Sequence, residues 1–199
     1  FTHRNSHLPQ GNIYEIFFDS TDRGWICTET GLAIWDGSMI RTDGFPQGFV
    51  NKQKIRDIFE DRNHNLYFLP DRGDICRSNL QLTEFAPLQG ISAATNRAAT
   101  FISEDADGML WIGSEMGLMQ FDGQETLRYF SLSDGLPSNV FTFCNPVKGE
   151  NGDLWLGNNQ GLVRLDLNRL RGEASLKSLP ELTEIASNGR SCLLYTSPS

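Results

Sequence analysis

The chain has 199 residues, which is long enough for one domain with a sizeable core. Its formal net charge of -8 argues against a nucleic-acid partner, which needs a basic surface facing the phosphate backbone. With 19 glycines and 13 phenylalanines, the chain combines many turns with many aromatic side chains, and this favours an all-β protein. No stretch approaches the roughly 20 apolar residues of a membrane-spanning helix.

The first residues carry neither a Met nor the basic and apolar regions of a signal peptide, so we expect the chain to be a piece of a longer protein. His3 and His7 have a spacing that would face one metal on a helix, but Pro9 follows and the helical pattern is missing. His64 lies in a polar turn and is expected to be solvated. We therefore expect no metal site and no cofactor.

A repeat of 42 to 44 residues dominates the chain. Its first landmark is an aromatic residue in a strand, found at Trp25, Tyr67, Trp111 and Trp155, at intervals of 42, 44 and 44 residues. Its second landmark is a turn glycine, found at the same intervals at Gly31, Gly73, Gly117 and Gly161. A period of about 40 to 45 residues is typical of a propeller blade made of four short strands.

Each repeat begins with a short apolar run that predicts a buried inner strand, at residues 13–18, 55–59, 99–103 and 140–144. In the first three repeats an acid, Asp19, Asp61 or Asp105, stands six residues before the aromatic and is expected to cap the turn. The aromatic strand and a third strand follow, and an outer strand such as 125–130 closes the unit. We expect Trp25, Trp111 and Trp155 to be core residues between neighbouring sheets.

The predicted fold is an all-β, partial β-propeller of about four blades, each with four antiparallel strands, arranged as an open arc. The second repeat is irregular, because Pro70 interrupts its aromatic strand; Pro70 should then lie at a strand end or edge. The predicted boundaries are blade one 1–48, blade two 49–90, blade three 91–135, blade four 136–170 and a connector toward a following domain 171–191.

The last eight residues, 192–199, match the in-frame translation of TGT CTC TTA TAC ACA TCT CCG AGC, a transposase end and adapter used in sequencing libraries. We expect them to lie outside the folded protein. Without Cys192, the remaining cysteines Cys27, Cys76 and Cys144 have no even pairing and no metal-ligand spacing. They are interpreted as small buried hydrophobic residues.

The fourth repeat carries a family resemblance. Residues 134–139 read Asp-Gly-Leu-Pro-Ser-Asn and precede an apolar strand, a Leu-Trp pair and a Gly-Leu turn. This string resembles the two-component regulator propeller repeat, and residues 42–46 echo its linker. The resemblance implies the sensor domain of a bacterial hybrid two-component system or sensor histidine kinase, on the periplasmic or extracellular face of the inner membrane. It further implies a membrane-anchored, dimeric whole protein and glycan-type ligands.

A candidate binding site follows from the repeat. Two residues before each turn glycine stand oxygen-bearing side chains, namely Glu29, Asp71, Glu115 and Asn159. In a propeller these would occupy equivalent loops on one face, near the mouth of the central channel, and could bind sugar hydroxyls or another polar small molecule. The alternative is a set of solvated loops that keep the surface acidic.

No catalytic motif is present in the sequence, so no catalytic residue is assigned to this chain. The leading functional hypothesis, which the family resemblance implies, is a ligand-sensing propeller without enzymatic activity of its own. Two alternatives remain open: a lyase-like, carbohydrate-active propeller enzyme, which needs His, Arg or Tyr in the channel, and a protein-binding propeller scaffold, which needs exposed aromatic patches on one face.

Overall fold

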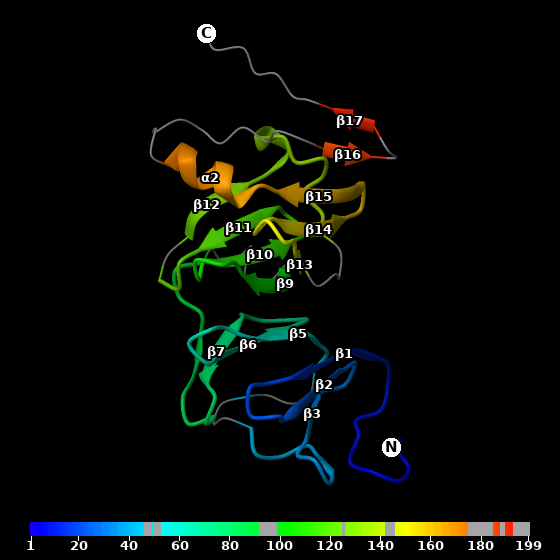
Figure 1. Cartoon of the computed structure of the whole chain (residues 1–199). Helices are drawn as coiled ribbons and strands as arrows, with labels where there is room; N and C mark the ends of the chain where they lie inside the picture. The colour runs from blue at the N-terminus through cyan, green and yellow to red at the C-terminus, as the bar shows by residue number, and fades with distance from the viewer. Residues whose placement is uncertain are drawn as a thin grey trace. The chain divides into compact units, whose positions relative to one another are not determined.

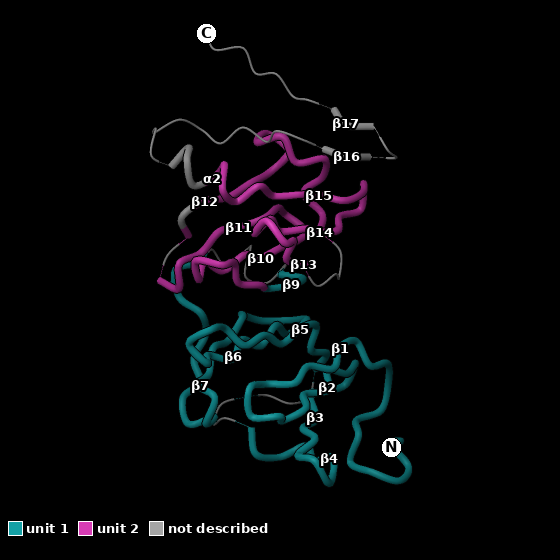
Figure 2. Tube along the Cα trace, viewed as in Figure 1, with its two compact units in different colours: residues 1–102 teal, residues 103–199 magenta. Residues whose placement is uncertain are grey.

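The computed structural model describes residues 1–45, 49, 53–91, 99–124, 126–141, 146–174, 185–187 and 190–192. These residues form four antiparallel sheets, each built from strands that follow one another in the chain (Figure 1). Two compact units divide the chain, residues 1–102 and 103–199 (Figure 2). The first unit holds the first two sheets.

The first sheet has the order β1-β2-β3-β4, with β1 at Ile13–Phe18, β2 at Gly24–Thr28, β3 at Leu32–Trp35 and β4 at Ile40–Arg41. The second has the order β5-β6-β7-β8, with β5 at Ile55–Glu60, β6 at Asn65–Pro70, β7 at Cys76–Asn79 and β8 at Phe85–Pro87. All neighbours pair antiparallel, as consecutive strands joined by short turns must.

The third sheet contains β9 at Ala99–Glu104, β10 at Leu110–Ser114, β11 at Leu118–Phe121 and β12 at Thr126–Phe130. A short 3-10 helix, η1 at Leu132–Asp134, leads out of it. The fourth contains β13 at Val147–Lys148, β14 at Leu154–Asn158, β15 at Gly161–Leu165, β16 at Ile185–Ser187 and β17 at Arg190–Cys192, with the helix α2 at Leu167–Ala174 between β15 and β16. Among the described helices, none is long and apolar enough to cross a membrane.

The all-β propeller fold with four successive blades is thereby confirmed. Its open arc, which depends on how the two units are placed, stays a prediction. The expected connector, 171–191, contains the end of α2 and the strand β16, and β17 runs into the tail as far as Cys192. The remaining tail, 193–199, lies outside the described residues.

A hydrogen bond from the buried aromatic residue to an aspartate recurs in the first three blades. Trp25 donates its indole N–H to Asp19 at 2.8 Å, and Trp111 donates to Asp105 at 2.9 Å. The Tyr67 hydroxyl, in the irregular blade, donates to Asp61 at 3.0 Å. Each aspartate uses its second oxygen to accept backbone N–H groups two and four residues further on. One carboxylate therefore closes the hairpin and fixes the aromatic ring.

The aspartates are buried, with 3% to 7% of their surface exposed, so their charge depends on these bonds. For Asp19, burial raises the pKa, but hydrogen bonds from Thr21, Trp25 and Arg23 outweigh it and hold the pKa below its usual value. The expectation that these acids cap turns is confirmed, and the bond to the aromatic ring is an additional role.

The fourth blade lacks this hydrogen bond, and the predicted burial of Trp155 is wrong. Gly149 stands where the other blades have aspartate, and Trp155 is half-buried. The guanidinium of Arg164 lies 5.7 Å from the Trp155 ring centroid and forms an ion pair with Asp153 at 2.7 Å. Trp25 and Trp111 are fully buried as predicted.

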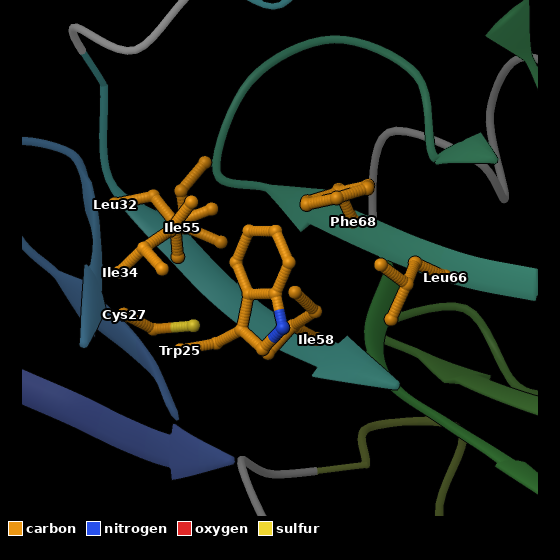
Figure 3. Close-up of a cluster of buried hydrophobic side chains, with 8 residues drawn as sticks. All are labelled: Trp25, Cys27, Leu32, Ile34, Ile55, Ile58, Leu66 and Phe68. Carbon is orange, nitrogen blue, oxygen red and sulfur yellow. The ribbon is translucent and has the colours of Figure 1, made fainter. Parts of the chain in front are cut away.

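The first two sheets share a hydrophobic core (Figure 3). The Trp25 ring meets Phe68 edge-on, with ring centroids 5.5 Å apart. The core draws side chains from both sheets, namely Trp25, Cys27, Leu32, Ile34, Ile55, Ile58, Leu66 and Phe68. This packing buries the inner strand β5, as its apolar sequence predicted.

The first inner strand forms at the predicted residues 13–18, but its predicted burial is wrong. β1 is mostly exposed, with Ile16 at 57% and Phe18 at 54%, because no sheet of the described part of its unit covers that face. In the fourth repeat, β13 pairs with β14, and most of the predicted inner strand 140–144 lies outside the described residues. Phe141 forms an isolated bridge with Asn158, and residues 142–145 lie outside the described residues.

The irregular features of the second blade match expectation. Pro70 is the last residue of β6, where it removes no hydrogen bond from the strand interior.

The turn glycine of the third blade, Gly117, has φ 146, and a Cβ there would come within 2.4 Å of the Phe130 carbonyl oxygen. Cys27 is a buried free thiol as predicted, whereas Cys76 is half-buried. Cys144 lies outside the described residues.

The shared aspartate predicts an unequal response to two similar substitutions in blade one. Asp19→Ala should lower the free energy of unfolding by about 3 kcal/mol, because it leaves the buried Trp25 N–H and the turn without an acceptor. Asp36→Ala removes an exposed turn-capping carboxylate and should lower the free energy of unfolding much less. Urea melts of the full chain measure both, and equal losses would contradict the proposed role of Asp19.

Candidate functional site

The four predicted site residues lie in equivalent turns of their blades, between the second and third strands. The backbone N–H of Glu29 donates to the Asn12 carbonyl at 3.0 Å, and that of Asp71 donates to the Lys54 carbonyl at 2.8 Å. Asn159 donates in the same way to Val140 at 3.2 Å. In these three blades the turn is thus fastened to the segment that leads into the inner strand.

Three of the four side chains face solvent. Glu29, Glu115 and Asn159 are exposed, and the Glu29 carboxylate accepts the Asn12 backbone N–H at 3.5 Å. Glu29 and Asp71 belong to the first unit, and Glu115 and Asn159 to the second. The structure therefore shows the four predicted residues at equivalent places in their blades. That they bind one ligand together stays a prediction.

Asp71 differs from the other three, because cations surround it. Arg56 donates to its carboxylate at 2.9 Å, and the Lys54 ammonium lies 3.9 Å away. The same ammonium stands 4.1 Å from the ring centroid of Tyr14, which is 41% exposed. At this turn the molecule offers donors and an aromatic face as well as an acceptor.

Sequence reasoning missed these cations. The available signal was their spacing: Lys54 and Arg56 stand on either side of Ile55, so they point to the same face at the start of β5. A neighbouring aspartate on the next strand could then have been expected to pair with them.

A second feature of the first unit is a pair of carboxyl groups on the inner strands. Glu15 on β1 and Asp57 on β5 occupy the same repeat position, 42 residues apart, and each follows an irregularity in strand pairing. Their side chains are hydrogen-bonded to one another. Asp57 is 4% exposed, and its carboxylate accepts the backbone N–H of Ile102 at 3.0 Å.

Two carboxyl groups can share a hydrogen bond only when one of them carries a proton. Burial, and then the adjoining Glu15, raise the pKa of Asp57 well above its usual range, although the backbone N–H groups of Ile102 and Ile58 oppose this. The same two acids, after burial itself, raise the pKa of the Cys27 thiol. The pair is therefore a proton-holding site inside the first unit, and its sequence signal was the recurrence of an acid at one repeat position.

Ser20, Glu60 and His64 form a third polar group. The Glu60 carboxylate accepts from the Ser20 hydroxyl at 2.6 Å and lies 2.6 Å from His64 Nδ1. The Ser20 hydroxyl also lies 3.1 Å from that same nitrogen. A serine nucleophile needs a histidine that contacts the serine and the acid through different ring nitrogens, so this arrangement does not activate Ser20.

Partial burial raises the pKa of Glu60, but the hydrogen bonds from Ser20 and His64 outweigh it and lower the pKa. The His64 side chain is 60% exposed, close to the solvated state that its turn predicted. Within the described part of the chain, no cluster of His, Cys, Asp and Glu could hold a metal ion.

Comparison with known proteins supports the fold described above. No family model and no curated protein matches the chain. Among solved structures, it is similar to the extracellular domain of the hybrid two component system BT3049 from B. thetaiotaomicron, with TM-score 0.64, 20% identity and coverage of 76% of this chain and 21% of that one. It is also similar to the extracellular domain of BT4673 from the same organism, with TM-score 0.65, 16% identity and coverage of 82% and 22%.

A third similar structure is virginiamycin B lyase from Staphylococcus aureus, with TM-score 0.56, 15% identity and coverage of 82% of this chain and 55% of the lyase. The chain thus spans about a fifth of the two extracellular domains and about half of the lyase. The resemblance to two-component propellers is supported at the level of fold: the blades of this chain have the fold of extracellular domains of two-component systems.

The carboxyl pair predicts a pH-dependent stability. Because the folded pKa of Asp57 lies above the unfolded value near 3.8, the stability from its bound proton is complete below that value and is lost as the pH rises through the folded pKa. Asp57→Asn cannot titrate, so its unfolding free energy should fall less than that of wild type as the pH rises above the unfolded value near 3.8. Urea melts at several pH values measure this difference.

Asp43→Asn is the control, because it makes the same chemical change at an exposed acid of the same unit. This variant should follow the wild-type pH dependence. Parallel pH profiles for wild type and Asp57→Asn would show that Asp57 does not hold the proton.

Proposed function

We propose that the chain is part of the extracellular, ligand-sensing propeller of a bacterial two-component signalling protein. The observation that carries this proposal is its likeness to two such extracellular domains over 76% and 82% of its length. The whole protein is then anchored in the inner membrane, dimeric, and connected to a histidine kinase. A sensor of this kind needs a ligand that binds one conformational state better than another.

We further propose that the ligand is a glycan fragment or another polar small molecule, bound at the turns that carry Glu29, Asp71, Glu115 and Asn159. The exposed carboxylates and amide supply acceptors for hydroxyl groups. In blade two, Lys54 and Arg56 add cationic groups, and the partly exposed Tyr14 ring lies beside the Lys54 ammonium.

A lyase is the second candidate, favoured by the fold shared with virginiamycin B lyase. A catalytically inactive form of that enzyme carries a histidine-to-alanine substitution. In the present chain, His64 lies in the turn between β5 and β6, whereas Asp71 follows the opposite end of β6. His64 is thus at the other end of the blade from the candidate site.

Calorimetry tests the binding proposal. The full chain is titrated with neutral and acidic oligosaccharides, and an oligosaccharide that binds is then measured against Glu29→Gln, Glu115→Gln and Asn159→Ala. At least two of these substitutions should weaken binding about tenfold or more, equivalent to about 1.4 kcal/mol. Asp36→Asn serves as control, because it changes an exposed carboxylate at the opposite end of β3.

Unchanged affinity in all three variants would place the ligand elsewhere. Turnover of an oligosaccharide, followed by chromatography of the titrated sample, would favour the lyase instead.

A further inference from the structure

A cavity of about 140 Å³ lies in the first unit, beside the turn between β6 and β7. Three phenylalanine rings, those of Phe49, Phe68 and Phe85, line it. Their centroids are 5.4, 5.7 and 6.0 Å apart, and the rings meet edge-on or tilted. Phe68 is buried against Trp25, whereas Phe49 and Phe85 remain half-buried.

The rest of the wall is also largely apolar. Pro70, Gly73 and the half-buried Cys76 belong to it, and Gln53 adds an amide. Burial and the nearby Asp74 charge raise the pKa of the Cys76 thiol to about 11, so the thiol is neutral at physiological pH and behaves as a small apolar group. Charged groups stand among the lining residues as well: Arg72, which is exposed, and Asp74.

We propose that this cavity is a second binding site, for a small molecule built on a single apolar ring with a polar group directed toward Arg72 and Asp74. Its volume is close to that of a cavity of about 150 Å³ that binds benzene in another protein. Aromatic walls favour an aromatic ligand, because ring pairs attract in edge-on and offset arrangements. A sugar ring fits less well, since the hydroxyl groups that lie against the three phenylalanine rings would find no hydrogen-bond partners there.

This site is independent of the one proposed for sensing. Asp71 belongs to the same turn, but it does not line the cavity and its carboxylate is held by Arg56. A finding that no polar ligand binds at the turns would therefore not affect this proposal. A finding that the cavity binds no aromatic ligand would likewise not affect the proposed site at the turns.

Binding of p-cresol to the full chain tests the proposal, with glucose as a polar ring of similar size. In NMR titrations, p-cresol should shift the aromatic resonances of the phenylalanines saturably, with a dissociation constant on the order of millimolar or tighter. Glucose should leave them unchanged. Failure of p-cresol to bind at millimolar concentration, or equal binding of glucose, would overturn the proposal.

Two variants locate the site. Cys76→Met fills the cavity with a longer apolar side chain and should weaken p-cresol binding roughly tenfold or more, whereas Cys76→Ala leaves the cavity open and should change it by less than about threefold. Phe85→Leu, which keeps an apolar wall but removes one ring, provides a further variant should Cys76→Met fail to fold. It should also weaken binding, and p-cresol affinity that is unchanged in Phe85→Leu would overturn the proposal.

Discussion

The hydrogen bond from a buried aromatic side chain to an aspartate is the interaction on which each regular blade depends. The aspartate closes the hairpin through backbone N–H groups and holds the ring of the next strand, as Asp19 does for Thr21, Arg23 and Trp25. A buried carboxylate without partners would be costly, and a buried indole N–H would be too. Each group thus satisfies the other, and the large ring can lie in the core between the first two sheets.

This interaction explains why the irregular second blade still forms. Tyr67 replaces tryptophan, but its hydroxyl reaches Asp61, and its side chain is 2% exposed. The fourth blade shows the opposite case. Gly149 supplies no acceptor, and the half-buried Trp155 lies beside Arg164 instead. Burial of the ring therefore depends more on the presence of the aspartate than on whether the ring belongs to tryptophan or tyrosine.

Spacing in the sequence was enough to predict the four blades and the turn glycines, because each depends on contacts within one repeat. The shared aromatic position also indicated correctly that Trp25 and Trp111 are buried. It failed for the burial of β1. The apolar sequence of β1 resembles that of β5, yet β5 packs against the first sheet while Ile16 and Phe18 are exposed. Of the candidate site, the equivalent turns were predictable, but the pairing of Asp71 with Arg56 and the contact of Glu15 with Asp57 join different strands and needed the structure.

The most direct test of the central interaction is the exchange of the indole N–H protons with solvent, followed by NMR on the ¹⁵N-labelled full chain. The indole protons of Trp25 and Trp111 are buried and bonded to aspartate, so they should exchange slowly, whereas that of the half-buried Trp155 should exchange rapidly. Exchange of the Trp25 and Trp111 protons as fast as that of Trp155 would contradict the claim that each regular blade depends on the hydrogen bond to aspartate.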